Sequence, residues 1–484
     1  MAYGIAERAE ARGWLVTDRG SSIALAVILV VAAYVRLHGL GDDSLWRDEA
    51  SSWGEAQGSF FDILAATAGD NYPPLHNLIL AASMRLFGQG EWALRISSAV
   101  FGAANVLALY WVGTIVGGRI TGLIAASLLA LSPFHIWYSQ EARNYALLSL
   151  NATLFAGTSL WLMRKATLGR VIAAFAAAVL LLYTHPYGAF AWLCVSAAVL
   201  VVLFLRPDPE APSPVIWVLL QLAAGLAFAP WAWLLLGRAN DIHEKGFWIS
   251  YPDLGYVMTQ LFNVASGALV FIALMLAIAA AFVQPRPGDG DHAQAGRIGL
   301  AASPDLWVVL AWMLGPVVIG IAISLVSTPI FIGRYIIGSL PAFLLLASVG
   351  LSRFVDGWRS ATAVALVVAF TITLGLAYGR PAPHEDWRRA APYLASHVGT
   401  DGCVLVPDAG YARVLSYYLK QPLPCVIDAS RLPPGGLQGN FVIVAMSGGA
   451  NRKILSALSP PTWQNGDVVS FQGIIVIPFR RTGT

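Results

Sequence analysis

Long apolar runs dominate this sequence and leave few folds open to it. We expect about eleven membrane-spanning helices, because runs of roughly 15 to 25 apolar residues are long enough to cross a bilayer as an α-helix. Only 12% of the 484 residues are charged, about half the usual share in a soluble protein. The predicted spans are 21–38, 92–116, 119–136, 144–163, 171–184, 187–205, 215–236, 257–283, 305–326, 330–350 and 360–378. The sequence therefore predicts an all-α polytopic membrane protein embedded in a lipid bilayer.

Basic residues beside the spans indicate the orientation. Arg8, Arg12 and Arg19 precede the first predicted span, and positive residues tend to stay on the cytoplasmic side. The N-terminus is therefore expected in the cytoplasm, and alternation puts most later basic residues in inner loops. The segments that this alternation places outside are 39–91, 137–143, 184–186, 238–256, 327–334 and everything after about residue 379. No basic stripe suggests a nucleic acid partner.

The first outer loop, residues 39–91, carries two adjacent carboxylates, Asp48 and Glu49, beside the bilayer. Loops of this length are often functional. The alternative is a solvated turn in which the pair caps a helix. Farther along, the apolar stretch 75–87 is too short to cross a membrane, so it predicts an interfacial helix that begins at Pro74.

A second polar cluster lies between the third and fourth predicted spans. It places Tyr138, Glu141, Arg143 and Tyr145 in one short connection. Such residues can serve only as interfacial anchors, but the combination of a carboxylate, a guanidinium and two phenols also suits a binding site. His185 lies at another outer turn, where a structural role is the commoner one for a lone histidine. Other residues in predicted outer segments or near their ends, left open between structural and binding roles, are Arg36, His38, His243, Glu244, Lys245 and Trp248.

Several motifs follow one another on the predicted outer side. They are Leu45-Trp46-Arg47-Asp48-Glu49-Ala50, Tyr72-Pro73-Pro74-Leu75, Tyr138-Ser139-Gln140-Glu141-Ala142-Arg143-Asn144-Tyr145 and Arg334-Tyr335. In this order the motifs resemble membrane glycosyltransferases of the C-type fold, in the branch of protein O-mannosyltransferases and bacterial lipid A aminoarabinose transferases. The resemblance covers roughly residues 20–350 and implies a polyprenyl-phosphate-linked sugar donor, with a hexosyl or pentosyl group, and an acceptor on the outer membrane face.

The resemblance also implies roles for individual residues. Asp48 matches the family's acidic residue in the first outer loop and is expected to be the catalytic base. Glu49 is a second catalytic position that tunes Asp48, binds the acceptor or exchanges roles with Asp48. Arg334 and Tyr335 match the expected clamp for the lipid phosphate. The remaining expected substrate-binding residues, from the resemblance and the outer-face pattern together, are Tyr72, His76, Tyr138, Glu141, Arg143 and His185.

The chemistry agrees with these residue types. A carboxylate can take the proton from an acceptor hydroxyl, and an arginine can hold the oxygens of the departing phosphate. Transfer is expected to invert the sugar carbon. Lipid, glycan and protein acceptors in the cell envelope all remain open. The other classes considered are a transporter or flippase of lipid-linked sugars, which usually has repeated halves and charges at mid-membrane, and an inactive relative that only binds the donor.

The composition changes after the last predicted span, so residues 1–378 form the predicted membrane domain and residues 379–484 a small α/β domain. Strands are expected at 404–406, 425–427, 441–446 and 468–477, and helices near 385–397, 410–420 and 451–458. An odd number of spans places this domain outside, in the periplasm of a bacterial inner membrane. Cys403 and Cys425 both fall in it and are equally consistent with a disulfide or with two buried thiols.

A metal ion is neither required nor excluded by the sequence, so no cofactor is assigned and a divalent metal stays compatible. The candidate ligands are Asp48, Glu49, Asp70, His76 and Glu141, and none of them shows a tight ligand spacing.

Overall fold

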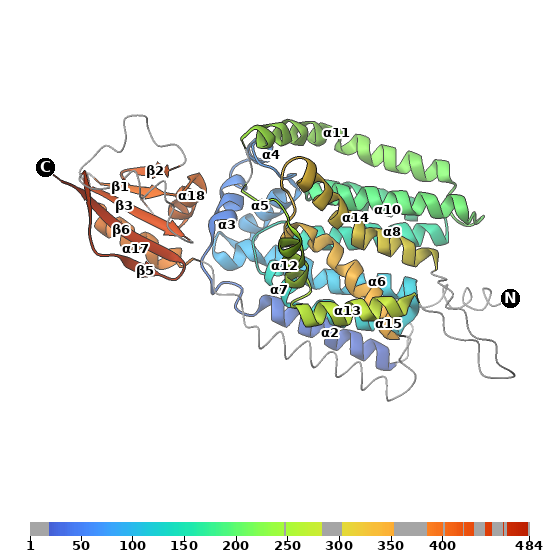
Figure 1. The fold of residues 1–484 in the computed structure, drawn as a ribbon. Coiled ribbons are helices and arrows are strands. Elements are labelled where there is room, and N and C mark those ends of the chain that lie inside the picture. Colours follow the sequence, from blue (N-terminus) through green and yellow to red (C-terminus); the bar gives the residue numbers. More distant parts are fainter. Residues whose placement is uncertain are drawn as a thin grey trace.

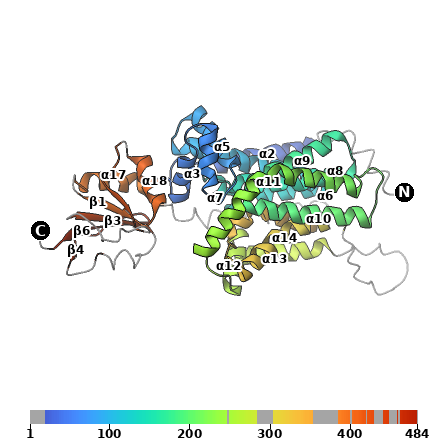
Figure 2. The same ribbon diagram turned by 90° about the horizontal axis from the view of Figure 1, so that it is seen from above.

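A computed structural model describes most of the chain. The described residues are 19–245, 248–282, 303–352, 385–399, 402–419, 421–429, 441–447, 458 and 462–482. They form a helical bundle with a small sheet domain at one end, beside the helices of the first outer loop (Figure 1). The view from above shows the same arrangement, with the sheet domain next to α3 (Arg47–Glu55) and α5 (Leu75–Phe87) (Figure 2).

The bundle consists of apolar helices that pack on a continuous hydrophobic core. Among the described residues, seven helices are long and apolar enough to cross a membrane, or eight if one bent pair counts as a single span. The bundle helices are α2 (Arg19–Leu37), α6 (Glu91–Ala130), α8 (Tyr145–Arg164), α9 (Leu168–Leu182), α10 (Pro186–Leu205), α11 (Pro214–Lys245), α12 (Leu254–Val264), α13 (Ala268–Ala281), α14 (Pro304–Val326), η1 (Gly333–Ser339) and α15 (Leu340–Ser352). The last predicted span, 360–378, lies outside the described residues, so the total of eleven stays a prediction.

Helix α6 is a hairpin and not one straight helix. Its 40 residues contain a break at Gly118, where φ is +84°, a value that favours glycine. A Cβ atom on Gly113 would lie 2.6 Å from the Cα of Gly122, a closeness that nine residues of straight helix do not allow. The predicted spans 92–116 and 119–136 therefore correspond to the two arms, although the second arm ends at Ala130.

The predicted span 257–283 is also bent. Helices α12 and α13 meet at an angle of 81°, and the break contains Ser266 with φ +66° and Gly267 with φ +131°. A break of this kind inside an apolar stretch makes it a broken span or a re-entrant segment. The predicted span 257–283 is therefore not one straight helix, and it corresponds to a single span only if this pair is a broken one.

The first outer loop is more regular than its sequence suggests. It folds into α3, α4 (Phe60–Ala68) and α5. Helix α4 begins with a complete capping box between Ser59 and Asp62, which satisfies backbone donors at its start. Helix α5 has the predicted bounds. The loop therefore presents helical side chains in fixed positions to the end of the bundle.

The C-terminal domain has a mixed sheet with the strand order β2-β1-β3-β6-β4, and β5 pairs with β6. Strands β1, β2 and β3 are parallel, whereas β6 runs antiparallel to β3, β4 and β5. The elements are α17 (Trp387–His397), β1 (Cys403–Val406), α18 (Ala409–Tyr418), β2 (Val426–Asp428), β3 (Phe441–Ser447), β4 (Trp463–Asn465), β5 (Val469–Phe471) and β6 (Ile474–Arg481).

Two details of that domain differ from the sequence prediction or complete it. The predicted strand 468–477 is a hairpin, because the chain turns at Gly473, where φ is +70°. Cys403 and Cys425 form a disulfide. The predicted helix 451–458 lies outside the described residues apart from Leu458.

Candidate functional site

The site is organised around helix α3, which begins at Arg47 directly after the extended residue Trp46. Asp48 and Glu49 both lie in its first turn, where negative charge interacts favourably with the helix dipole. Although they are neighbours, their side chains have entirely different surroundings.

Glu49 is enclosed. Both oxygens of its carboxylate accept hydrogen bonds from Arg95 of α6, Nε to Oε1 and Nη2 to Oε2, each at 2.7 Å. The backbone N–H of Ala142 donates to Oε1 at 2.7 Å, and the Glu49 and Arg95 side chains are 0% and 3% exposed. A carboxylate with this pairing has little capacity to take a proton from a substrate. The geometry favours a role in which Glu49 ties α3 to α6 and to residues 141–143.

Asp48 is more open, with its side chain 15% exposed and placed between two arginines. Arg47 donates from Nη1 to Oδ1 at 3.2 Å, and Nη1 of Arg334 lies 3.6 Å from Oδ2. Asp48 is therefore the member of the acidic pair that a substrate can reach.

Arg334 reaches Asp48 from the 3-10 helix η1 and lies among aromatic rings. Its guanidinium carbon is 5.0 Å from the centroid of Trp248 and 5.7 Å from that of Trp46. Tyr145 and Tyr335 are at 5.9 and 5.8 Å. Cation–π contacts of this kind hold a guanidinium in place without using up its N–H donors, so they fix Arg334 in a position where it can bind an anion.

A second arginine, Arg143, approaches α3 from the segment before α8. It donates from Nη1 to the Ser52 hydroxyl at 2.9 Å and to the Asp48 carbonyl at 3.2 Å. Its guanidinium also lies 5.0 Å from the centroid of Tyr72. The two predicted polar clusters of the sequence therefore meet in space.

The predicted tyrosines and histidine at the outer turns form one aromatic group. The hydroxyls of Tyr72 and Tyr335 are 2.8 Å apart. The His185 ring lies 5.1 Å from the ring of Tyr72 and 4.9 Å from that of Tyr335, and its Nδ1 accepts the N–H of Tyr187 at 3.0 Å. The tautomer with hydrogen on Nε2 is thereby favoured. These residues from three distant segments line a single pocket.

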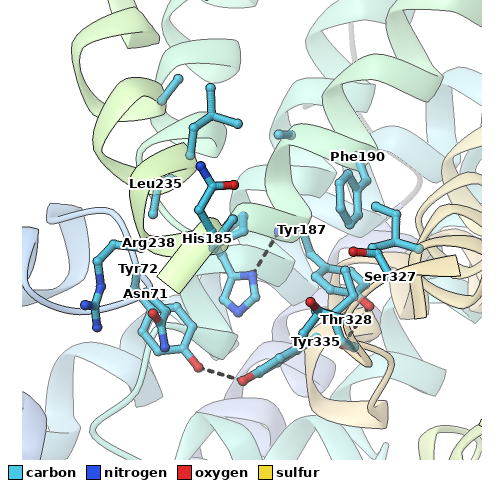
Figure 3. Close-up of a pocket in the computed structure, with 18 of the residues that line it drawn as sticks. Asn71, Tyr72, His185, Tyr187, Phe190, Leu235, Arg238, Ser327, Thr328 and Tyr335 are labelled. Carbon is cyan, nitrogen blue, oxygen red and sulfur yellow. Dashed lines mark hydrogen bonds between the residues drawn. The ribbon is translucent and has the colours of Figure 1, made fainter. Parts of the chain in front are cut away.

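That pocket lies between the start of α10, the later part of α11, the end of α14 and η1, and has a volume of about 630 Å³. Its wall is mainly apolar, while Tyr72, His185, Tyr335 and Arg238 supply polar groups (Figure 3). Figure 3 shows the two phenols side by side with the imidazole of His185. An apolar wall with a polar end matches a lipid that carries a polar head group.

The other predicted binding residues lie around this centre. Tyr138 packs edge-on against Tyr145 at 5.0 Å, and Glu141 is buried and lines a small cavity with Arg95 and Trp137. His76 is buried and makes a hydrogen bond of 3.2 Å from Nε2 to the Ala142 carbonyl. Burial, and then the charge of Arg143, lower the pKa of His76 to about 3. A neutral His76 that supports the segment of Ala142 is therefore expected at physiological pH.

Other candidates from the sequence have different outcomes. Arg36 is fully buried and donates to the carbonyls of Ala32, Leu129 and Ala130, so it caps the second arm of α6. His38 is exposed and stacks on Tyr34. The side chains of His243, Glu244 and Lys245 lie outside the described residues.

The structure adds residues that the sequence did not single out. Arg95 is the partner of Glu49, and an arginine within the second turn of an apolar helix was the available signal. Glu55, also on α3, accepts from Asn77 at 3.0 Å. Burial, and then the nearby charge of Asp70, raise the pKa of Glu55 to about 7.

The metal hypothesis finds no support in the donor set. Among the described residues, no group of three or more His, Cys, Asp and Glu side chains is arranged to hold a metal ion. The carboxylate of Asp48 instead faces two guanidinium groups, a surrounding that suits an anion better than a cation. Metal dependence stays an open prediction, and no chemical step below uses a metal.

Comparisons with known proteins agree with the motifs. The family model described as dolichyl-phosphate-mannose-protein mannosyltransferase matches residues 71–233. These residues include the Tyr72 motif and the whole Tyr138–Tyr145 cluster. No curated protein matches the sequence.

Solved structures give a longer match. ArnT from Cupriavidus metallidurans, in a structure bound to undecaprenyl phosphate, superimposes with a TM-score of 0.61 at 15% identity, over 96% of this chain and 99% of that one. An oligosaccharyltransferase from Archaeoglobus fulgidus gives a TM-score of 0.52 at 13% identity, over 87% of this chain and 67% of that one. The arabinofuranosyltransferase AftD from Mycobacteria gives 0.51 at 17% identity, over 96% of this chain and 41% of that one.

The sequence identities are low, so these matches speak for the fold. The family match, the full-length superposition and the apolar helices point in the same direction. The chain is a multi-pass membrane protein with the fold of the C-type glycosyltransferases, and its residues 71–233 are similar to the dolichyl-phosphate-mannose-protein mannosyltransferase family.

Proposed function

We propose that this protein transfers a sugar from a polyprenyl phosphate to an acceptor in the cell envelope, on the outer face of the membrane. The observation that carries the proposal is the pairing of Asp48 with Arg334, 3.6 Å apart, near the polar end of an apolar pocket to which Tyr335 belongs. A base and a phosphate-binding cation thereby lie next to a space that suits the lipid portion of the donor.

The reaction follows from these positions. Asp48 takes the proton of the acceptor hydroxyl, whose oxygen attacks the anomeric carbon of the sugar. The bond from that carbon to the phosphate oxygen breaks, and the lipid phosphate leaves with the electron pair and no added proton. Arg334 stabilises the charge on the departing phosphate. A single displacement from the opposite face inverts the anomeric carbon.

Two observations support an outer location for the site. The disulfide between Cys403 and Cys425 is of a kind that persists in oxidising compartments. The C-terminal domain that contains it contacts helix α3 directly, since Nε of Arg47 lies 2.9 Å from the Asp408 carboxylate. The domain and the site therefore share one side of the membrane, and we assign that side to the periplasm of a bacterial inner membrane.

A transfer assay tests the proposal. The full chain in nanodiscs receives a panel of hexosyl and pentosyl polyprenyl phosphates, with total envelope extract as acceptor. We expect labelled product with one donor, and a loss of roughly 100-fold or more in rate for Asp48→Asn, since a positioned base is worth 10²–10⁴-fold. Asp62→Asn, which changes an exposed carboxylate of the same outer loop, is the matched control and should stay near the wild-type rate. Wild-type rates in Asp48→Asn would exclude Asp48 as the base.

Binding of undecaprenyl phosphate tests the other half of the site. Arg334→Lys keeps the charge but loses the planar fork of donors, so we expect affinity to fall roughly 10-fold, and further for Arg334→Ala. Arg85→Ala, which removes an exposed arginine of the first loop, should bind like the wild type. Equal affinity in all four proteins would remove the phosphate role of Arg334. Binding without transfer by any donor would favour a binding or transport role.

A further inference from the structure

The C-terminal domain reaches the candidate base through one side chain. Arg47 donates from Nη1 to Asp48 at 3.2 Å and from Nε to Asp408 at 2.9 Å. Asp408 precedes α18, and its carboxylate also accepts the N–H of Gly410 at 2.8 Å, so its position is fixed by the start of that helix. Arg47 is therefore held between the C-terminal domain and the carboxylate of Asp48.

Helices α3 and α18 are in close contact along this face. A Cβ atom on Gly410 would lie 2.8 Å from Cγ of Arg47, so glycine is what allows the Arg47 side chain to lie against the start of α18. On the same face, Ala50 is fully buried in the core of the C-terminal domain together with Trp387. The contact is therefore packed and does not consist of a single ion pair.

We propose that Asp408 and Arg47 are positioning residues that orient the carboxylate of Asp48 for the transfer reaction, which makes the C-terminal domain a working part of the site. This inference rests on the proposed function, because it assigns a role relative to Asp48 as base. When the donor phosphate engages Arg334, Arg47 remains to orient the other oxygen of Asp48.

The exposure of the pair indicates that its role is geometric. The side chains of Arg47 and Asp408 are 42% and 30% exposed, and ion pairs at that exposure contribute little to stability. A small displacement of a reacting group, in contrast, can change a rate by up to two orders of magnitude. Loss of the Asp408 charge should therefore affect turnover more than folding.

The matched variants are Asp408→Asn and Asp386→Asn. Each aspartate caps a helix of the C-terminal domain, Asp408 at α18 and Asp386 at α17, and asparagine is an equally good cap. Only the first substitution removes a charge that Arg47 contacts, since Asp386 pairs with Arg389 of its own helix. With the donor that gives product, we expect Asp408→Asn to lower kcat roughly 10-fold at an unchanged donor KM, and Asp386→Asn to match the wild type.

A double-mutant cycle separates positioning from general loosening. If Asp408 acts through Arg47, Asp408→Asn should have no further effect on kcat in an Arg47→Ala background. Gly410→Ala, which crowds Arg47 and Asp408 from the other side, should lower kcat in the same direction. Effects of Arg47→Ala and Asp408→Asn that multiply would overturn the inference.

A measurement without substrate keeps the inference testable on its own. Hydrogen exchange of the amides of α3, residues 47–55, should be faster in Asp408→Asn than in Asp386→Asn, in full-length protein in nanodiscs. Equal exchange in the two variants overturns the inference. If Asp48→Asn is inactive while Asp408→Asn matches Asp386→Asn in both kcat and exchange, the positioning role fails and the proposed function stands. If Asp48→Asn is fully active, the proposed function itself fails.

Discussion

The two faces of helix α3 are held in opposite ways. Toward the bundle, Glu49 and Arg95 form a buried pair with both carboxylate oxygens occupied. Toward the C-terminal domain, Arg47 and Arg413 form partly exposed pairs with Asp408 and Glu55. Breaking a buried pair is costly because one charge stays behind without a partner, whereas exposed pairs contribute little. The bundle face therefore anchors the helix, whereas the other face holds it more weakly and is the face to which we assign the positioning of Asp48.

The largest effect should come from the buried pair. Arg95→Ala leaves the Glu49 carboxylate enclosed without its cation, so we expect it to lower the free energy of unfolding by about 3–5 kcal/mol. Thermal unfolding in nanodiscs measures this. Adding Glu49→Gln should recover part of the loss, because a neutral amide tolerates burial better. If Arg95→Ala unfolds at the same temperature as Arg85→Ala, the buried pair does not anchor α3 and the contrast between its two faces is wrong.

The next effect concerns pH and the Glu55–Arg413 contact. The pKa of Glu55 is raised to about 7 from 4.5, so the folded state binds the extra proton. The associated stability is present below about pH 4.5 and is lost as the pH rises through 7. Glu55→Gln keeps the neutral form at every pH. Its free energy of unfolding relative to that of the wild type should therefore rise between pH 5 and pH 8, by up to roughly 3 kcal/mol, and its relative melting temperature should rise with it.

The control for that experiment is Asp62→Asn. The pKa of Asp62 is lowered by its hydrogen bonds with Ser59, so its contribution changes below this pH range. A pH profile of Glu55→Gln that runs parallel to the wild type would show that Glu55 is already ionised at pH 5.

Packing between α3 and the C-terminal domain gives a smaller effect. Ala50→Leu adds volume to a fully buried position, and overpacking typically costs about 1–3 kcal/mol. We expect either a lower melting temperature or faster proteolysis of the domain. Unchanged melting and proteolysis would mean that α18 moves away from α3 easily. The contact between α3 and the C-terminal domain would then position Asp48 less firmly than the packing suggests.

The smallest effect should be at another contact of the C-terminal domain, where α17 meets the start of α6. Arg388 binds Glu91 at 2.9 Å but is 45% exposed, so Arg388→Ala should lower stability by about 1 kcal/mol or less. The same melting experiment checks this. A loss comparable with that of Arg95→Ala would remove the distinction between buried and exposed ion pairs on which the comparison rests.

Much of the architecture was readable from local patterns. Apolar runs predict the bundle, and the bounds of α5 follow from a short apolar stretch after Pro74. The change in composition after the spans predicts the α/β domain. These features depend on neighbours in the chain, because helix formation and the length needed to cross a bilayer are local properties. Local breaks are harder to predict, as the bend at Ser266 and Gly267 and the turn at Gly473 show.

The roles within the site depended on contacts between distant segments. The sequence favoured Asp48 as the base only through the family resemblance and left the reverse assignment to Glu49 open. Their difference arises because Arg95, 46 residues farther along the chain, forms a buried pair with Glu49, whereas Asp48 pairs with Arg334. The link from Asp408 to Arg47 spans 361 residues. Periodicity and motifs report which residues share a face of one helix, whereas ion-pair partners and burial are set by how the helices pack, and that information exists only in the folded chain.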